Sequence, residues 1–258
     1  MIKKNLMHEA IINHTDDYIF NILDIENFNS DNSRLRFWFE HCKKNIDKIE
    51  GDIFEFGVFK GSSLISIAML LKKIGSDKKV YGFDSFSGFP PYHPNDSLNA
   101  FESNPKIFDE EHIKKHKLLM NITSIKKKDI SPLNISSAGN FSDTTEESVR
   151  KRINDFELDN IELVVGEYSK TIPFFFKTYK GIIFSCNMDC DLYLSYKQAL
   201  PFVYKKMTDG SFIHLDEYYS LKFPGARIAC VEFFKKMNIN PSKCIVPANE
   251  FERWCLIK

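Results

Sequence analysis

The amino-acid sequence predicts a single α/β domain built on a doubly wound, mostly parallel β-sheet. From residue 52 onward, short apolar segments alternate with amphipathic helical segments, which is typical of such sheets. The apolar segments are nearly continuous, as expected for strands covered on both faces. Residues 243–258 instead contain two short apolar runs around "PANE", which predicts a closing antiparallel hairpin. The length of 258 residues fits one domain, residues 1–258.

The alternation of strands and helices can be followed segment by segment. The expected parallel strands are "DIFEFGVF" (52–59), "KVYGFDSF" (79–86), "NIELVVGEY" (160–168), "GIIFSCNMD" (181–189) and "GSFIHLDEY" (210–218). After the first strand, residues 61–75 predict a helix because apolar residues recur at helical spacing: Leu64, Ala68, Leu71 and Ile74. A helix expected after Asp191 has one apolar side: Tyr193, Tyr196, Leu200, Val203 and Met207.

Two segments stand outside this alternation. Residues 1–50 have helical spacing, as in "RLRFWFEHCKKNIDKI", and predict a helical N-terminal cap on the main domain. Residues 87–140 are rich in Pro, Ser, Asn and Lys and follow the second strand, at the edge where α/β sheets bind ligands. We expect this insertion to be a mobile lid or substrate loop. A helix then begins near residue 141, with Thr144 and Glu147 at capping-box spacing.

The composition excludes several classes of protein. Lys plus Arg and Asp plus Glu both number 35, so the chain lacks the basic excess of a nucleic-acid binder. No apolar run approaches the ~20 residues that span a bilayer, and the N-terminus lacks a hydrophobic signal core. We therefore expect a cytoplasmic protein without a membrane span. The six cysteines form no CxxC pair and are expected to be core residues.

The turn after the first strand, "FEFGVFKGSSL", has the character of a ligand-binding turn. Gly57 and Gly61 let the backbone approach a ligand, and the helix that follows supplies free amides. The turn is neither a GxGxxG fingerprint nor a P-loop, and a plain tight turn explains it equally well. Asp84, at the end of the second strand, is placed to accept hydrogen bonds from ribose hydroxyls, although it could instead cap the turn at Ser85. Together these features favour an adenosine-containing ligand.

Acidic residues follow two of the predicted strands. Asp189 ends the fourth strand, and Asp216 and Glu217 end the fifth. Neighbouring strands lie about 5 Å apart, and buried carboxylates are costly unless they are paired or bind metal. We expect the three to converge on one cation, Mg²⁺ by preference, with Ca²⁺ or Mn²⁺ as alternatives. The competing interpretation is that they cap helices or face solvent. His214, in the same strand, is expected to be a core histidine.

Several segments resemble one known family. They are "EFGVFKGSSL", "VYGFDSFSGFP", "TTEESVRKRI", "ELVVGEYSKTIP", "MDCDLYLSYKQAL" and "DGSFIHLDEYY", and they cover roughly residues 50–235. In content and order they resemble the macrocin O-methyltransferase (TylF-like) family of enzymes that depend on S-adenosylmethionine and Mg²⁺. The resemblance implies a Rossmann-like class I methyltransferase fold. It also implies methyl transfer to a hydroxyl of a sugar or sugar nucleotide, which would be the small-molecule partner.

The resemblance also implies roles for individual residues. It assigns to the cofactor Glu55, Gly57, Gly61 and Ser63 at the methionine end, Asp84 and Ser85 at the ribose, and Gly166 and Tyr168 at the adenine. It assigns the metal to Asp189, Asp216 and Glu217, the last in place of the usual Asp. The family's catalytic histidine is absent from "PLNISSAGNFSD", the stretch before "TTEESV". The general base is therefore open, and the candidates are Asp191 and His214, with His93, His112 and His116 in the insertion.

Other interpretations remain at this point. A strand that ends in Asp-x-Asp is also typical of nucleotide-sugar glycosyltransferases, but the glycine turn, Asp84 and the second acidic pair disfavour that class. A non-catalytic α/β interaction module is a third class. A homo-oligomer is suggested by the aromatic residues Phe37 and Trp38, for which a place in the core is the competing interpretation.

Overall fold

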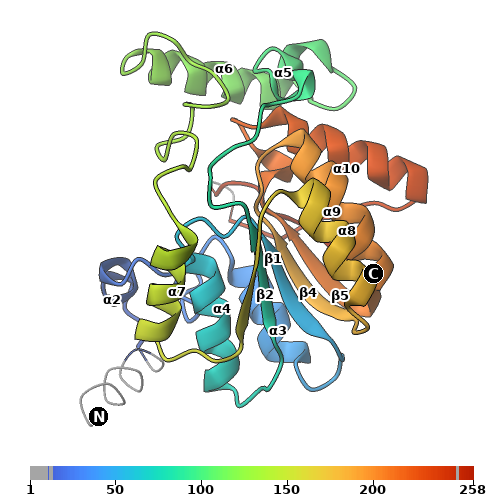
Figure 1. Ribbon diagram of the computed structural model, residues 1–258. Coiled ribbons are helices and arrows are strands. Elements are labelled where there is room, and N and C mark those ends of the chain that lie inside the picture. The colour runs from blue at the N-terminus through green and yellow to red at the C-terminus, as the bar shows by residue number, and fades with distance from the viewer. Residues whose placement is uncertain (1–10, 12–13, 248–249) are drawn as a thin grey trace.

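The computed structural model describes residues 11, 14–247 and 250–258. In these residues the chain forms a seven-stranded sheet of order β3-β2-β1-β4-β5-β7-β6 (Figure 1). The five strands from β3 to β5 are parallel to their neighbours, whereas β7 is antiparallel to both β5 and β6. The strands are β1 (Asp52–Phe56), β2 (Val80–Asp84), β3 (Ile161–Val165), β4 (Ile183–Met188), β5 (Met207–Leu215), β6 (Ser242–Lys243) and β7 (Trp254–Ile257). The doubly wound sheet and its closing antiparallel pair are confirmed.

Helices cover both faces of the sheet, each over its own hydrophobic core (Figure 1). One face carries α3 (Arg36–Asn45), α4 (Ser62–Lys73) and α7 (Glu146–Asp155). The other carries α8 (Tyr168–Thr178), α9 (Tyr193–Lys206) and α10 (Pro224–Met237). The predicted apolar faces pack inward: in α4, Leu64, Ala68 and Leu71 are fully buried, and all five apolar residues expected on one side of α9 are buried. Burial on both faces explains why β1, β2 and β4 are mostly apolar.

The N-terminal part of the described chain contains α2 (Asp17–Ile22) and α3. Residues 1–10, 12 and 13 of the predicted cap lie outside the described residues. Trp38 on α3 is fully buried, and its Nε1 donates to Ser185 Oγ of β4 at 3.0 Å. Trp38 is therefore a core residue that docks α3 on the sheet, which confirms the core interpretation and removes its support for a homo-oligomer.

The insertion after β2 contains helices that we did not predict. They are η1 (Pro94–Asp96), α5 (Ala100–Ser103) and α6 (Glu110–Ser124), and they lie beside α10, above the carboxyl ends of the parallel strands (Figure 1). Buried polar contacts hold the segment. The Asp96 carboxylate accepts from the Tyr193 N–H at 2.7 Å, and ring nitrogens of His112 and His116 lie 2.8 Å from the carbonyls of Ser220 and Leu221.

The predicted capping box at the start of α7 is displaced by one residue. Thr145, not Thr144, is the N-cap, and its Oγ1 accepts from the Ser148 N–H at 3.1 Å, while the Thr145 N–H donates to Ser148 Oγ. Thr144 is buried, and its hydroxyl donates to the Phe59 carbonyl at 3.2 Å. The residue expected to cap the helix thus ties the chain to the turn after β1.

Two further expectations can be compared with the structure. All six cysteines are unbridged, and five of them are buried core residues as expected, whereas Cys244 is half-buried. Among the described helices, none has the length and apolar character needed to cross a bilayer.

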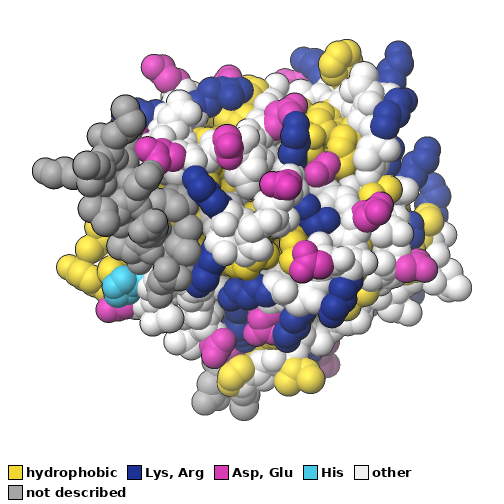
Figure 2. All heavy atoms as spheres, turned by 90° about the horizontal axis from the view of Figure 1, so that it is seen from below, with side chains coloured by type: hydrophobic (Ala, Val, Ile, Leu, Met, Phe, Trp, Pro, Cys, Tyr) yellow, Lys and Arg dark blue, Asp and Glu magenta, His cyan; other side chains and the backbone are white. Residues whose placement is uncertain are grey.

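On the side facing away from α5 and α6, basic and acidic side chains are interspersed (Figure 2). The described residues of this face therefore form no broad patch of one charge.

Candidate active site

A cleft of about 1480 Å³ opens at the carboxyl ends of the parallel strands. Its walls come from the turn after β1, the end of β2, the acidic residues after β4 and β5, the N-terminal segment 17–34 and parts of the insertion. Pockets for a single small ligand are typically about 300–1,000 Å³. The cleft therefore has room for a nucleoside-sized ligand and a second small molecule.

The turn after β1 requires glycine at its first position. Gly57 has φ +93°, and a Cβ placed on it would lie 1.7 Å from the carbonyl oxygen of Asp189. Both the left-handed backbone and the close passage of the chain after β4 therefore exclude a side chain. Gly61, with φ +81°, is the N-cap of α4 and shapes the turn without lining the cleft.

Asp84 stabilises this turn. Its Oδ2 accepts the N–H groups of Val58 and Phe59 at 2.8 and 2.9 Å, and its Oδ1 accepts the N–H of Phe86 at 2.8 Å. Asp84 therefore caps the turn, which was the alternative to its role in ribose binding. A carboxylate offers about four acceptor positions, so Asp84, which lines the cleft, keeps capacity for a ligand hydroxyl.

Glu55 lies buried beneath the turn. Its Oε1 accepts from the Ser63 hydroxyl and from Asn187 Nδ2, the latter at 2.8 Å. Glu55 Oε2 and Asn187 Oδ1 are buried acceptors without a donor in the described chain. Such acceptors are costly, and a cationic ligand end rich in N–H groups, or a water that it binds, would satisfy them. Because neither residue lines the cleft, a ligand above the turn would reach these oxygens through a bound water rather than directly.

The remaining residues predicted for the cofactor occupy the end of β2 and the start of α8. Tyr168 and Ser85 line the cleft, and the Tyr168 hydroxyl donates to the Phe83 carbonyl at 3.0 Å. Gly166, with φ +132°, donates its N–H to the Asp84 carbonyl at 2.9 Å and does not itself line the cleft. Three of the predicted cofactor residues, Glu55, Gly61 and Gly166, do not line the cleft. The others do: Gly57, Ser63, Asp84, Ser85 and Tyr168.

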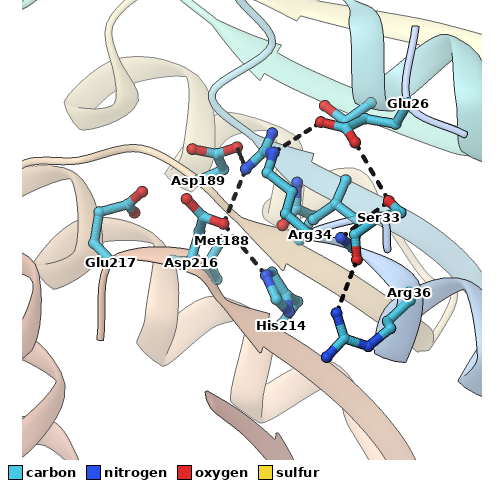
Figure 3. A network of polar contacts seen from close by, with 12 residues as sticks. Glu26, Ser33, Arg34, Arg36, Met188, Asp189, His214, Asp216 and Glu217 are labelled. Atoms are coloured by element: carbon cyan, nitrogen blue, oxygen red, sulfur yellow. Dashed lines mark hydrogen bonds and ion pairs between the residues drawn. The ribbon is translucent and has the colours of Figure 1, made fainter. Parts of the chain in front are cut away.

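The three predicted metal ligands come together. In the parallel register of β4 and β5, Met188 pairs with Leu215, so the residues that follow both strands are neighbours. One carboxylate oxygen from each of Asp189, Asp216 and Glu217 lies within 4.8 Å of the others. Three convergent carboxylates form the oxygen-only donor set that Mg²⁺ and Mn²⁺ prefer. The donor set fits a divalent cation, and Figure 3 shows its surroundings.

Arg34 is the site residue that sequence reasoning missed. Its Nη1 lies 2.9 Å from Asp189 Oδ2 and 2.9 Å from Asp216 Oδ1, and its Nε donates to Glu26 at 2.8 Å (Figure 3). Burial by itself would raise the pKa of Asp216, but Arg34 and a contact from His214 hold it well below its usual range. Arg34 therefore keeps part of the acidic cluster ionised.

Glu217, which the resemblance places where an Asp is expected, has different contacts. It is buried, and its Oε2 lies 2.6 Å from the Tyr196 hydroxyl and 3.3 Å from the Asp191 N–H. Burial, and then the charges of Asp189 and Asp216, raise its pKa well above the usual value. The added methylene thus carries a carboxyl group that is anchored on α9 and has no contact with Arg34.

Among the candidates for the general base, Asp191 has the favourable position. It lines the cleft with a left-handed φ of +58°, and its carboxylate has no hydrogen-bond or ion-pair partner in the described part of the chain. A strained residue in a cleft is a reason to consider function. His214 is fully buried, lies 3.3 Å from Asp216 Oδ1 and does not line the cleft.

The histidines of the insertion have structural contacts instead. His93 caps η1 and stacks on Tyr193 with ring centroids 4.5 Å apart. His112 and His116 anchor α6 on the carbonyls that follow η2 (Asp216–Tyr219). None of these three lines the cleft, so the structure does not support the expectation that one of them reaches in as the base.

The comparisons with known proteins agree with this geometry. The family model described as macrocin O-methyltransferase (TylF) matches residues 32–125 and 120–246. The chain belongs to the macrocin O-methyltransferase family. This O-methyltransferase is 25% identical over 206 residues to mycinamicin III 3''-O-methyltransferase from Micromonospora griseorubida, a match that covers 78% of this chain and 68% of that protein.

Solved structures of similar fold include two O-methyltransferases. NovP superposes with a TM-score of 0.62 at 17% identity, covering 97% of this chain and 98% of NovP. CalS11, a calicheamicin methyltransferase, has a TM-score of 0.58 at 20% identity, covering 85% of this chain and 77% of CalS11. A second solved structure is described as that of CalS11, a TDP-rhamnose 3'-O-methyltransferase. These likenesses confirm the class I methyltransferase fold.

The buried Glu55 leads to a prediction on pH and stability. Burial raises its pKa to about 8, against about 4.3 for an unfolded Glu. Between these values the folded chain keeps a proton that the unfolded chain releases, so the free energy of unfolding falls as pH rises. Relative to Glu55→Gln, the wild type should lose up to about 1.4 kcal/mol per pH unit from pH 5 to 8, measured by urea unfolding. A constant difference between the two proteins across this range would show that Glu55 is already ionised in the folded state.

Proposed function

We propose that this O-methyltransferase transfers the methyl group of S-adenosylmethionine to a hydroxyl of a sugar or sugar-containing small molecule, with Mg²⁺ bound by Asp189, Asp216 and Glu217. The observation that carries the proposal is the convergence of these three carboxylates in the same cleft as the glycine turn. The names of the mycinamicin and calicheamicin relatives support a sugar as the acceptor. Family membership sets aside the glycosyltransferase and the non-catalytic module.

The cofactor is assigned to the side of the cleft formed by β1 and β2. Gly57 allows close approach of the backbone, Asp84 offers acceptor positions for ribose hydroxyls, and Ser63 and Glu55 lie below the methionine end. When bound, S-adenosylmethionine supplies the methyl group on its sulfonium. The residues of the turn fix its position, and positioning of two reactants contributes about 7–11 kcal/mol to lowering a barrier.

The acceptor is assigned to the side of the cleft beyond the acids. A divalent ion, when bound, would lower the pKa of the acceptor hydroxyl and orient it. Asp191 is placed to take the proton that the hydroxyl loses as its oxygen becomes the ether oxygen. Phe89 of the insertion and Phe141, directly after it, line the cleft and would exclude water from it.

The direct test is a thermal-shift measurement with S-adenosylhomocysteine and with UDP- or GDP-sugars. A ligand that binds only the folded state stabilises it by about 2.7 kcal/mol at 100 times its Kd. We expect S-adenosylhomocysteine to raise the melting temperature of the wild type, and Asp84→Ala to lose most of this shift. Asp77→Ala, an exposed residue before the opposite end of β2, is the matched control and should keep it. A shift with the sugar nucleotides but not with S-adenosylhomocysteine would contradict the proposal.

Two cations on the acceptor side suggest an anionic acceptor. Lys222 and Arg253 line the cleft, and neither side chain has a hydrogen-bond or ion-pair partner among residues 11, 14–247 and 250–258. An arginine fork suits the phosphate of a sugar nucleotide, and a charge-assisted hydrogen bond contributes about 1.5–3 kcal/mol. We therefore expect Arg253→Gln to raise KM about 10-fold or more for a nucleotide-linked sugar and little for the free sugar. An equal rise for both acceptors would refute this role for Arg253.

A further inference from the structure

We propose that Asp96, in the insertion after β2, is a positioning residue that holds the strained turn at Asp191 and thereby directs the Asp191 carboxylate into the cleft. The inference rests on Asp191 as the base of the proposed function. It gives the insertion a second role, since the insertion then completes the catalytic geometry as well as lining the cleft.

The chain makes a strained turn at Asp191, between the end of β4 and the start of α9. The Leu192 N–H donates to the Cys190 carbonyl at 2.6 Å, and Asp191 between them has φ +58°. A hydrogen bond that spans a single left-handed residue is the rare and strained form of the γ-turn. A residue other than glycine keeps such a conformation only where the surrounding structure holds it. The contacts on both sides of Asp191 therefore decide where its carboxylate points.

The chain before the turn is held against β1. The Asp189 N–H donates to the Phe56 carbonyl at 3.0 Å. The backbones also pass closely here, because a Cβ placed on Gly57 would lie 3.3 Å from the Cα of Cys190. Residues 189 and 190 are thus fixed by the sheet and the glycine turn, and the strained turn can relax only toward α9.

The chain after the turn is held by Asp96. Leu192 is the N-cap of α9, but its apolar side chain cannot accept the free N–H groups of the first helical turn. Asp96 Oδ1 accepts the Tyr193 N–H at 2.7 Å instead, and Asp96 Oδ2 accepts the His93 N–H at 2.9 Å. The Asp96 side chain is buried, and the His93 ring stacks on Tyr193. The start of α9 is thus fixed by a residue that lies 97 positions before Tyr193.

Gly225, near the start of α10, makes room for this contact. A Cβ placed on Gly225 would lie 1.9 Å from Asp96 Oδ1 and 2.8 Å from the Cβ of Tyr193. Any side chain at this position would therefore displace Asp96 from the start of α9. The insertion, α9 and α10 thus meet at one buried carboxylate, two residues along the chain from Asp191.

A crystal structure of Asp96→Ala tests the positioning directly. With the Tyr193 N–H released, Asp191 should leave its left-handed conformation and its carboxylate should turn away from the cleft. Gly225→Ala, which crowds Asp96 without removing it, should have the same effect and replaces Asp96→Ala if that variant does not fold. An Asp191 that keeps its conformation and its place in the cleft in either variant would overturn the inference.

Kinetics separate the placing of the base from the docking of the insertion. With methyl-labelled S-adenosylmethionine and a panel of UDP- and GDP-sugars as acceptors, Asp96→Ala and Gly225→Ala should lower kcat about 10- to 100-fold, because misplacement by about 1 Å can cost 10²-fold. KM should stay within about threefold. A rise in KM with wild-type kcat would show that Asp96 only docks the insertion, and would overturn the inference.

Two further variants serve as rescue and control. Asp96→Asn keeps an oxygen for the Tyr193 N–H and should recover kcat to within about fivefold of the wild type. Glu232 also contacts Tyr193, but at the ring hydroxyl, which donates to Glu232 Oε2 at 2.9 Å. Glu232→Gln is therefore the matched control and should keep wild-type kcat. An equal loss of kcat in Glu232→Gln and Asp96→Ala would refute a specific role for the backbone contact.

The double variant of Asp96→Ala and Asp191→Asn distinguishes this inference from the proposed base. If Asp96 acts through Asp191, the double variant should be at most about twofold slower than Asp191→Asn, because residues that act as one unit are not additive. Losses that multiply would overturn the inference and leave Asp191 as the base. Wild-type kcat in Asp191→Asn alone would overturn the base of the proposed function, and this inference with it.

Discussion

Replacement of Asp189 by Asn should reduce kcat for methyl transfer by about 10²–10³-fold, the range seen when one electrostatic group of an active site is removed. Asp189 supplies one of the three converging carboxylates, lies beside Asp216 and lines the cleft. Asn keeps the shape but loses the charge that holds a cation. Because the cofactor residues belong to β1 and β2, the thermal shift with S-adenosylhomocysteine should remain.

The control for this variant is Asp77→Asn, an exposed residue at the opposite edge of the sheet, which should keep full activity. Excess EDTA should reduce wild-type activity to the level of Asp189→Asn, and added Mg²⁺ should restore it. Undiminished methyl transfer by Asp189→Asn, or by the wild type in EDTA, would remove the metal from the proposed mechanism.

Asp191→Asn should reduce kcat by about 10²–10⁴-fold, the usual contribution of a positioned general base. The Asp191 carboxylate faces the cleft without a partner in the described residues, so its loss removes proton transfer without breaking a contact. The variant should therefore keep KM, Mn²⁺ affinity and the thermal shift with S-adenosylhomocysteine. Steady-state kinetics beside these two binding measurements separate its role from that of Asp189.

His214→Gln is the informative comparison for Asp191. His214 is fully buried and lies 3.3 Å from Asp216 Oδ1, so its replacement should lower stability or Mn²⁺ affinity more than kcat. If Asp191→Asn keeps kcat within about threefold while His214→Gln loses activity at saturating Mg²⁺, the base is His214 and the assignment to Asp191 is wrong.

Local pattern was sufficient to predict most of the central fold. Strands β1 and β4 are apolar because both faces of the sheet are covered, and α4 has its apolar residues on one side. The helices of the insertion were not predicted, because α6 buries His112 and His116, which do not mark an apolar face by residue type. Their burial depends on carbonyls that follow η2, more than a hundred residues further along the chain.

The part of the site whose position follows from the geometry of the sheet alone was predictable. Asp189, Asp216 and Glu217 meet because parallel neighbouring strands end at the same edge. Arg34 was not predictable, since its partners lie 155 and 182 residues away and the stretch around it has only the pattern of a helical cap. The orphaned oxygens of Glu55 and Asn187 are likewise visible only after the two strands are paired.

Anomalous diffraction from crystals grown with Mn²⁺ and S-adenosylhomocysteine is the most direct test of the proposed site. The account predicts one manganese peak between the carboxylates of Asp189, Asp216 and Glu217, at coordination distance from their oxygens. It also predicts S-adenosylhomocysteine on the glycine turn beside the ion. S-adenosylhomocysteine bound there with no manganese at the three acids would contradict it.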